Sequence, residues 1–140
     1  MVNEAELVAA LEQQLGVEVR MLDFGKRPFE EEVASLQDVR VLFGMQGSGL
    51  INGWYLPPQS GTVVLYQYGG WDVFEEYLGP LGNYAWWVNE DEGSSVCNHA
   101  IDPFCDSPDT VVDVEAALRI LGRALATSRA HCGEAEVTGT

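Results

Sequence analysis

Apolar residues recur along the chain at helical and strand spacing in alternation. Leu7, Leu11 and Leu15 share one face of a predicted helix that begins at a capping-box-like Asn3 and ends at Gly16. Further helices are predicted after Pro28, through Asn52 to Tyr55, from Asp72 to Gly79, and from a cap at Asp109 to Ala130.

Four short runs rich in β-branched and aromatic residues separate these helices and predict strands. They span residues 17–24, 39–43, 62–66 and 84–88, and the second is apolar enough to be buried on both faces. Such alternation predicts an α/β fold: a Rossmann-like parallel sheet of about four strands with helices on both faces. Because the series begins with a helix, we expect the strand before Met1 to be missing and the chain to be the later part of a longer parent. The domain is assigned to residues 1–130, with a long polar loop at 89–108 and a flexible tail at 131–140.

Composition narrows the possible partners. The chain has 140 residues, with 22 acidic and 7 basic side chains and a net charge of −15. Nucleic acid and anionic membranes require clustered Lys and Arg, so neither is an expected partner. The sequence predicts no membrane segment, and the first sixteen residues, MVNEAELVAALEQQLG, lack the cations of a signal peptide.

The segment Gly44-Met45-Gln46-Gly47-Ser48-Gly49-Leu50 carries the main candidate chemistry. It leaves a predicted strand and enters a helix, where glycines let a ligand approach and the first helical N–H groups are unpaired donors. An anion or a sugar-nucleotide diphosphate fits such a place, and a tight turn without a ligand fits it equally well. No Lys or Arg occurs from residue 41 to 118. A diphosphate would therefore depend on backbone N–H groups, on Ser48, or on cations from residues 20–40, the last helix or another domain.

The other conspicuous residues have simpler interpretations. Cys97 and Cys105 lie close enough in sequence to pair, and the sequence leaves that pairing open. Their spacing with His99 and His131 matches no zinc pattern, so no metal site is predicted. Trp71 follows a strand on the side of the glycine loop and is the candidate aromatic contact for a base or sugar. Adjacent strand residues point to opposite faces, so we expect Trp86 and Trp87 to pack separately. The acidic run at 89–92 is interpreted as a solvated loop.

The segment GMQGSGLINGWYLPPQSGTVVLYQYG resembles the central signature of the family-61 glycosyltransferases, roughly G-M-H-G-A-G-L-T-N-x-x-F-L-P-P-G-A-x-V-V-E-L-F-P-Y. It agrees at Gly44, Met45, Gly47, Gly49, Leu50, Asn52, Leu56, Pro57, Pro58, Val63, Leu65 and Tyr68. The flanking helices and strands resemble the family more weakly, over about residues 2–127. Two positions depart from the pattern: Gln46 stands for the motif histidine, and Val64 for a glutamate that we interpret as a ribose-binding carboxylate.

The resemblance implies the donor-binding, C-terminal lobe of a two-lobed (GT-B) enzyme, present here in part. It implies inverting transfer from a nucleotide sugar, UDP-linked being one candidate, to a glycan or protein acceptor, with no separate cofactor or metal. Family members work in the secretory pathway, in the Golgi or ER lumen. The expected donor contacts are Gly44, Gln46, Gly47, Ser48, Gly49, Leu50, Asn52 and Trp71. No catalytic base is assigned, and the isolated chain is not expected to turn over. The alternative is a non-catalytic α/β binding or regulatory module derived from such a lobe.

Overall fold

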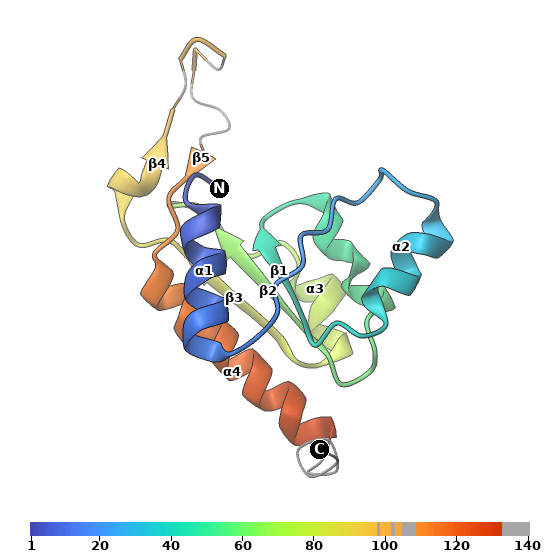
Figure 1. The fold of residues 1–140 in the computed structure, drawn as a ribbon. Coiled ribbons are helices and arrows are strands. Elements are labelled where there is room, and N and C mark those ends of the chain that lie inside the picture. The colour runs from blue at the N-terminus through green and yellow to red at the C-terminus, as the bar shows by residue number, and fades with distance from the viewer. Residues whose placement is uncertain (98, 102, 105–108, 133–140) are drawn as a thin grey trace.

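A three-stranded parallel sheet forms the centre of the computed structural model, which describes residues 1–97, 99–101, 103–104 and 109–132. Its strands are β1 (Val41–Met45), β2 (Gly61–Tyr66) and β3 (Tyr84–Val88), in that spatial order (Figure 1). The parallel α/β class is confirmed. The expectation of a fourth strand in this sheet is not met by the described residues.

Helices cover both faces of the sheet, as expected. On one face lie α1 (Glu4–Leu15) and α4 (Val114–Cys132). The other face is covered by α2 (Phe29–Leu36), the 3-10 helix η1 (Ser48–Tyr55) and α3 (Glu75–Leu78), with the short η2 (Gly79–Leu81) following (Figure 1).

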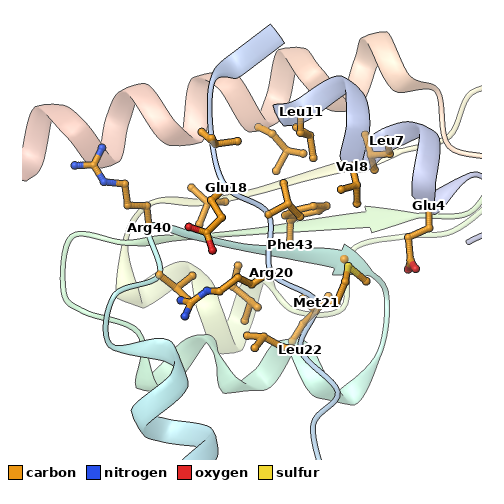
Figure 2. Close-up of a pocket in the computed structure, with 18 of the residues that line it drawn as sticks. Glu4, Leu7, Val8, Leu11, Glu18, Arg20, Met21, Leu22, Arg40 and Phe43 are labelled. Carbon is orange, nitrogen blue, oxygen red and sulfur yellow. The ribbon is translucent and has the colours of Figure 1, made fainter. Parts of the chain in front are cut away.

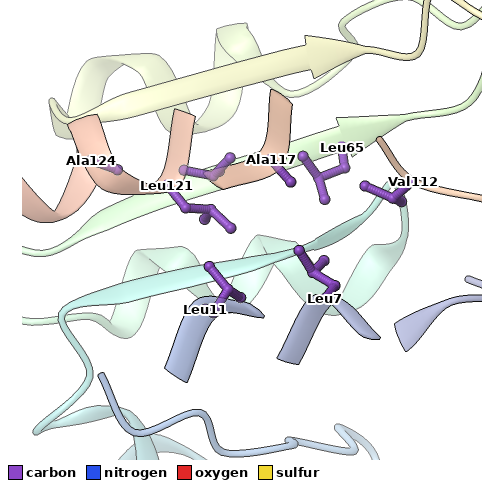
Figure 3. Close-up of a cluster of buried hydrophobic side chains, with 8 residues drawn as sticks. Leu7, Leu11, Leu65, Val112, Ala117, Leu121 and Ala124 are labelled. Atoms are coloured by element: carbon purple, nitrogen blue, oxygen red, sulfur yellow. The ribbon is translucent and has the colours of Figure 1, made fainter. Parts of the chain in front are cut away.

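Two hydrophobic clusters hold these layers together, because side chains of β2 point alternately to opposite faces. Val63 and Leu65 join the α1–α4 side, whereas Val64 and Tyr66 join the α2–η1 side. Figure 3 shows the first cluster gathered between α1 and α4, with buried members Leu7, Leu11, Val63, Leu65, Val112, Ala117, Leu121 and Ala124. Its small members on α4, Ala117 and Ala124, let that helix approach the sheet closely. The larger Leu118 and Leu125 of the same helix are only partly buried.

The segment at residues 17–24 is the clearest error of the sequence prediction. It has the alternating composition of a strand but forms no ladder with β1. Its apolar side chains are still used: Val17 and Val19 pack on the first cluster, and Leu22 and Phe24 on the second. The alternating apolar residues of this segment therefore reflect packing against both clusters. Their backbone does not form the hydrogen-bonded ladder that defines a strand.

The roles of β1 and β2 also differ from the prediction. The strand predicted at 39–43 is β1, which is shifted to Val41–Met45 and lies at the sheet edge, with only Leu42 fully buried. The central strand is β2, in which every residue is buried. The apolar composition of β1 therefore reflects contact with helices on both sides, and one edge of its backbone remains unpaired among the described strands.

The caps of two helices differ from the prediction: Asn3 does occupy the N-cap position of α1, but without a capping bond from its side chain, and Asp109 does not cap α4. The Asn3 side-chain amide donates to the Val112 carbonyl and its oxygen accepts from the Val112 N–H, each bond 2.8 Å long. These bonds join the start of α1 to the residues just before α4. The cap of α4 is Asp113, whose carboxylate accepts from the Ala116 N–H at 3.0 Å. Asp109 instead pairs in a small antiparallel sheet of β4 (Ser95–Val96) and β5 (Asp109–Thr110), inside and next to what was predicted as a loop.

Some predictions fall outside the described residues. Helix α4 includes residues 131 and 132 of the predicted tail, and residues 133–140 are not described. Cys97 is disulfide-bonded. Cys105, whose pairing with Cys97 the sequence left open, lies outside the described residues. Among the helices that the structure describes, none is both long and apolar enough to cross a bilayer.

Candidate functional site

The glycine loop leaves the carboxyl end of β1 and turns directly into η1. Gly44 and Met45 belong to the strand, and the Gln46 N–H continues the sheet by donating to the Leu65 carbonyl at 2.9 Å. Gly47 then turns the chain with an extended backbone (φ 179°), and Ser48 begins η1. The loop therefore lies at the carboxyl ends of the parallel strands, which is where open α/β folds bind their ligands.

The loop is organised by hydrogen bonds to its carbonyl oxygens. The Leu50 N–H donates to the Gly47 carbonyl at 3.1 Å, and the Asn52 side-chain amide donates to the Gly49 carbonyl at 2.8 Å. Since the bond from Leu50 closes the first turn of η1, the N–H groups of Ser48 and Gly49 precede any intrahelical acceptor. These two groups are therefore oriented as candidate donors for an anion.

Close packing explains why two glycines are needed near this loop. A Cβ on Gly49 would lie 3.2 Å from the Phe24 ring, and one on Gly53 would lie 2.6 Å from the Thr62 hydroxyl. At Gly47 the nearest atom would be the Met45 carbonyl at 3.7 Å, which is an ordinary contact. Sequence reasoning did not single out Gly53, although its place between Asn52 and Trp54 in the signature segment was the available signal.

A cleft of about 680 Å³ runs along the outer side of β1 and reaches the glycine loop. Figure 2 shows Leu7, Val8 and Leu11 of α1 on one side of it and Phe43 of β1 beneath. Of the expected donor contacts, the cleft brings together Gly44, Gly47, Gly49 and Leu50. Gln46, Ser48, Asn52 and Trp71 do not line it.

Arg20 and Arg40 line the same cleft, together with Glu4 and Glu18 (Figure 2). Asp38 lines it as well. Arg20 forms an exposed ion pair with Asp38 at 2.6 Å, and its hydrogen bond is the main reason that the pKa of the Asp38 carboxyl is lowered. Cations from residues 20–40 therefore do lie on the cleft that the glycine loop borders, although no Lys or Arg occurs within that loop or after it until residue 119.

Trp71 lies beyond the end of β2 and is 73% exposed. Asp72, which follows it, accepts hydrogen bonds on one carboxylate oxygen from the hydroxyls of Tyr66 and Tyr84, both at 2.6 Å. Burial opposes ionisation of Asp72, but these bonds and those from the backbone of Phe74 and Glu75 outweigh it, so its pKa is lowered. The same burial and the neighbouring carboxylate raise the pKa of both tyrosines. The network fixes the turn that carries Trp71.

The two departures from the family signature occupy different environments. Val64 is completely buried among Leu36, Leu42 and Leu50, so its side chain packs in the core and not at the carboxyl end of the strand. The interpretation of this position as a ribose-binding carboxylate does not suit its placement here. Gln46, by contrast, follows β1 directly and lies in the loop itself.

The adjacent tryptophans of β3 do point to opposite faces. Trp87 packs on the α1–α4 cluster, and Trp86 lies edge-on to Tyr66, with ring centroids 6.3 Å apart, on the other face. Among the described residues, no group of three or more His, Cys, Asp or Glu side chains is arranged to hold a metal ion.

The fold and the loop define the class of this protein: a parallel α/β domain whose glycine-rich turn connects a strand end to a helix. The family model for glycosyltransferase 61 matches residues 1–65, which run from α1 into β2 and contain the glycine loop. These residues belong to the glycosyltransferase 61 family, as their signature segment predicted.

A curated relative agrees with this assignment. The chain is 30% identical over 101 residues to protein O-linked-mannose beta-1,4-N-acetylglucosaminyltransferase 2 of Takifugu rubripes. The match covers 67% of this chain but 17% of that relative, so the chain spans about a sixth of the relative's length.

Proposed function

We propose that this chain supplies donor contacts for a nucleotide sugar in a family-61 glycosyltransferase of the two-lobed type. The observation that carries the proposal is the glycine loop, whose Ser48 and Gly49 N–H groups precede the first helical bond at the end of β1. The loop also lies inside the segment that matches the family.

In this proposal the diphosphate lies against the N–H groups of Ser48 and Gly49, with the Ser48 hydroxyl as a further donor. Gly44, Gly47 and Leu50 form the adjoining surface of the cleft, and Asn52 holds the Gly49 carbonyl. Gln46 takes the place of the motif histidine as a neutral hydrogen-bonding group. Trp71 is the proposed aromatic contact for a base or sugar, by stacking.

The charge of the chain limits how such a site could work. A net charge of −15 repels a diphosphate, and Arg20 and Arg40 are the cations that line the same cleft. Because Arg20 is already paired with Asp38, its contribution to phosphate binding is reduced. We therefore expect weak donor affinity in this chain alone, and we propose that catalysis and the glycan or protein acceptor site depend on further parts of a longer enzyme that works in the secretory pathway.

A non-catalytic binding module derived from such a lobe is the second candidate. Gln46 favours it, because an amide cannot titrate and so cannot exchange a proton as the motif histidine could. This alternative keeps nucleotide binding possible and removes the transfer step.

Calorimetric titration of the whole chain with UDP and with UDP-N-acetylglucosamine tests the donor site. We expect weak binding that Gly47→Val abolishes, because a branched side chain there crowds the approach to the Ser48 and Gly49 N–H groups. Val96→Ala, at an exposed position of β4, is the control and should bind as the parent does. Absence of both heat and a thermal shift at millimolar nucleotide would overturn the donor-site proposal.

A further inference from the structure

Three of the seven basic side chains of this protein line one pocket, formed by residues 20–27 and α2. The pocket has a volume of about 520 Å³, and its lining consists of Arg20, Met21, Leu22, Asp23, Lys26, Arg27 and Ser35. Three cations and one carboxylate give this lining a formal charge of +2. The whole chain carries −15, and no Lys or Arg occurs from residue 41 to 118. The pocket is therefore a local concentration of positive charge in an acidic chain.

Two of these cations, Lys26 and Arg27, are exposed, and neither forms an ion pair with another described residue. They follow Gly25, which turns the chain in the left-handed conformation at φ 85°. The Gly25 N–H donates to the buried Glu32 carboxylate of α2 at 2.5 Å, and Glu32 does not line the pocket. The backbone before the two cations is thus tied to α2, while their charged groups stay accessible to a ligand.

The third cation, Arg20, is held at the pocket by acceptors of the protein itself. Its Nη2 atom donates to the Asp38 carboxylate at 2.6 Å and to the Ser35 carbonyl at 3.5 Å. A guanidinium group has five N–H donors, so Nε and Nη1 are left for a ligand. The Ser35 hydroxyl already donates to the Glu32 carbonyl at 2.6 Å. The donors that the lining side chains offer to a ligand are therefore cationic.

We propose that this pocket binds a phosphate group, free or carried on a small ester, at a site separate from the glycine loop. Phosphate suits these donors, because guanidinium groups bind its oxygens in pairs and an ammonium group adds a point charge. Charges more than about 8 Å apart are largely screened at physiological ionic strength, so a small anion meets mainly the positive lining. A nucleic acid or an anionic membrane would extend over the acidic remainder of the surface and be repelled. The proposal does not depend on nucleotide-sugar binding.

The apolar part of the lining gives an ester further surface to contact. Met21 is 64% exposed, and Leu22 lies beside it in the chain. Both residues, with Arg20, line this pocket and also the cleft shown in Figure 2, so the two hollows adjoin. The carbon skeleton of an ester can therefore lie against Met21 while its phosphate meets the cations.

Titration of the whole chain with sodium phosphate at constant ionic strength, followed by NMR, tests the proposal. We expect saturable shifts of the Gly25, Lys26 and Arg27 amides with a millimolar Kd, because exposed ion pairs are individually weak. The double variant Lys26→Gln/Arg27→Gln should bind at least about tenfold more weakly. The control is Arg119→Gln/Arg123→Gln, which removes two exposed cations of α4, changes the net charge equally and should bind as the parent does.

Glucose 6-phosphate and glucose, titrated in the same way, distinguish the two sources of phosphate. Tighter binding of glucose 6-phosphate than of inorganic phosphate would assign the pocket to an ester, and equal binding would assign it to the phosphate ion. UDP tests the glycine loop separately: absence of shifts at the Ser48 and Gly49 amides would count against the donor site alone. Phosphate-induced shifts that do not saturate at tens of millimolar, that are equal in both double variants, that appear at Ser48 and Gly49 instead, or that glucose reproduces would overturn the proposal.

Discussion

Gly53→Ala is the substitution that most directly tests the packing of η1 on the sheet. The added Cβ would lie 2.6 Å from the Thr62 hydroxyl and 3.3 Å from a Leu78 methyl group. Thr62 is 5% exposed and Leu78 is 1% exposed, so neither neighbour can turn into solvent. The helix and the strand must therefore separate, or Thr62 must change rotamer inside the core.

Overpacking of this kind costs about 1–3 kcal/mol, which the better helix propensity of alanine offsets by up to about 1 kcal/mol. We expect a net loss of about 1–2 kcal/mol in the free energy of unfolding. Gly47→Ala is the matched control: its Cβ would meet only the Met45 carbonyl at 3.7 Å, and its φ of 179° suits any residue. That variant should be neutral or slightly more stable, because alanine reduces the freedom of the unfolded chain.

Urea denaturation followed by circular dichroism measures both variants under the same conditions. Equal m-values would show that the difference lies in stability and not in the extent of unfolding. If Gly53→Ala proves as stable as Gly47→Ala, the close approach of η1 to β2 does not exist in solution, and the reasoning is wrong.

Three further substitutions test other parts of the fold. Leu121→Ala should lower the free energy of unfolding by about 2–5 kcal/mol in a denaturant titration, because Leu121 is 2% exposed in the α1–α4 cluster. Asn3→Ala removes both bonds to the buried Val112 backbone and should cost about 1–3 kcal/mol, with faster exchange of the Val112 amide as the local readout. Asp72→Asn should destabilise the chain at neutral pH, and the difference from the parent should shrink on acidification. The folded pKa of Asp72 is lowered, so its stabilisation is full above its unfolded pKa of about 3.9 and is lost as the pH falls through the folded value. A difference that stays constant down to pH 3 or below would contradict the assigned role of the carboxylate.

The sequence predicts well those elements whose signals are local. Helix α1 ends at Gly16, which takes the left-handed conformation at φ 63°, as a glycine stop requires. Strand β3 spans Tyr84–Val88, as its aromatic and β-branched composition predicted. In both cases neighbouring residues decide the conformation, so the pattern is sufficient.

The errors arise where a distant partner decides the outcome. Asn3 has the spacing of a capping box, and its side-chain amide does donate to Glu6 at 3.4 Å. Its two shorter bonds, of 2.8 Å each, go instead to the backbone of Val112, more than a hundred residues away. Residues 17–24 alternate as a strand does, but their side chains are taken up by both clusters while the backbone stays unpaired. The strands β4 and β5 have two residues each and are set by pairing across the loop between them.

The candidate site likewise has one part that neighbouring residues determine and one part that distant segments assemble. The glycine loop is a local feature, and its position between β1 and η1 follows from the sequence. The cleft beside it is assembled from α1, residues 16–24, β1 and α4, and no spacing in the sequence reports that assembly. Arg20 and Arg40 thereby reach the surface that the loop borders, from a part of the chain that ends before β1. No Lys or Arg occurs from residue 41 to 118, and Lys26 and Arg27 do not line the cleft, so Arg20 and Arg40 are the arginine or lysine side chains of the N-terminal half that border the surface where a diphosphate would lie.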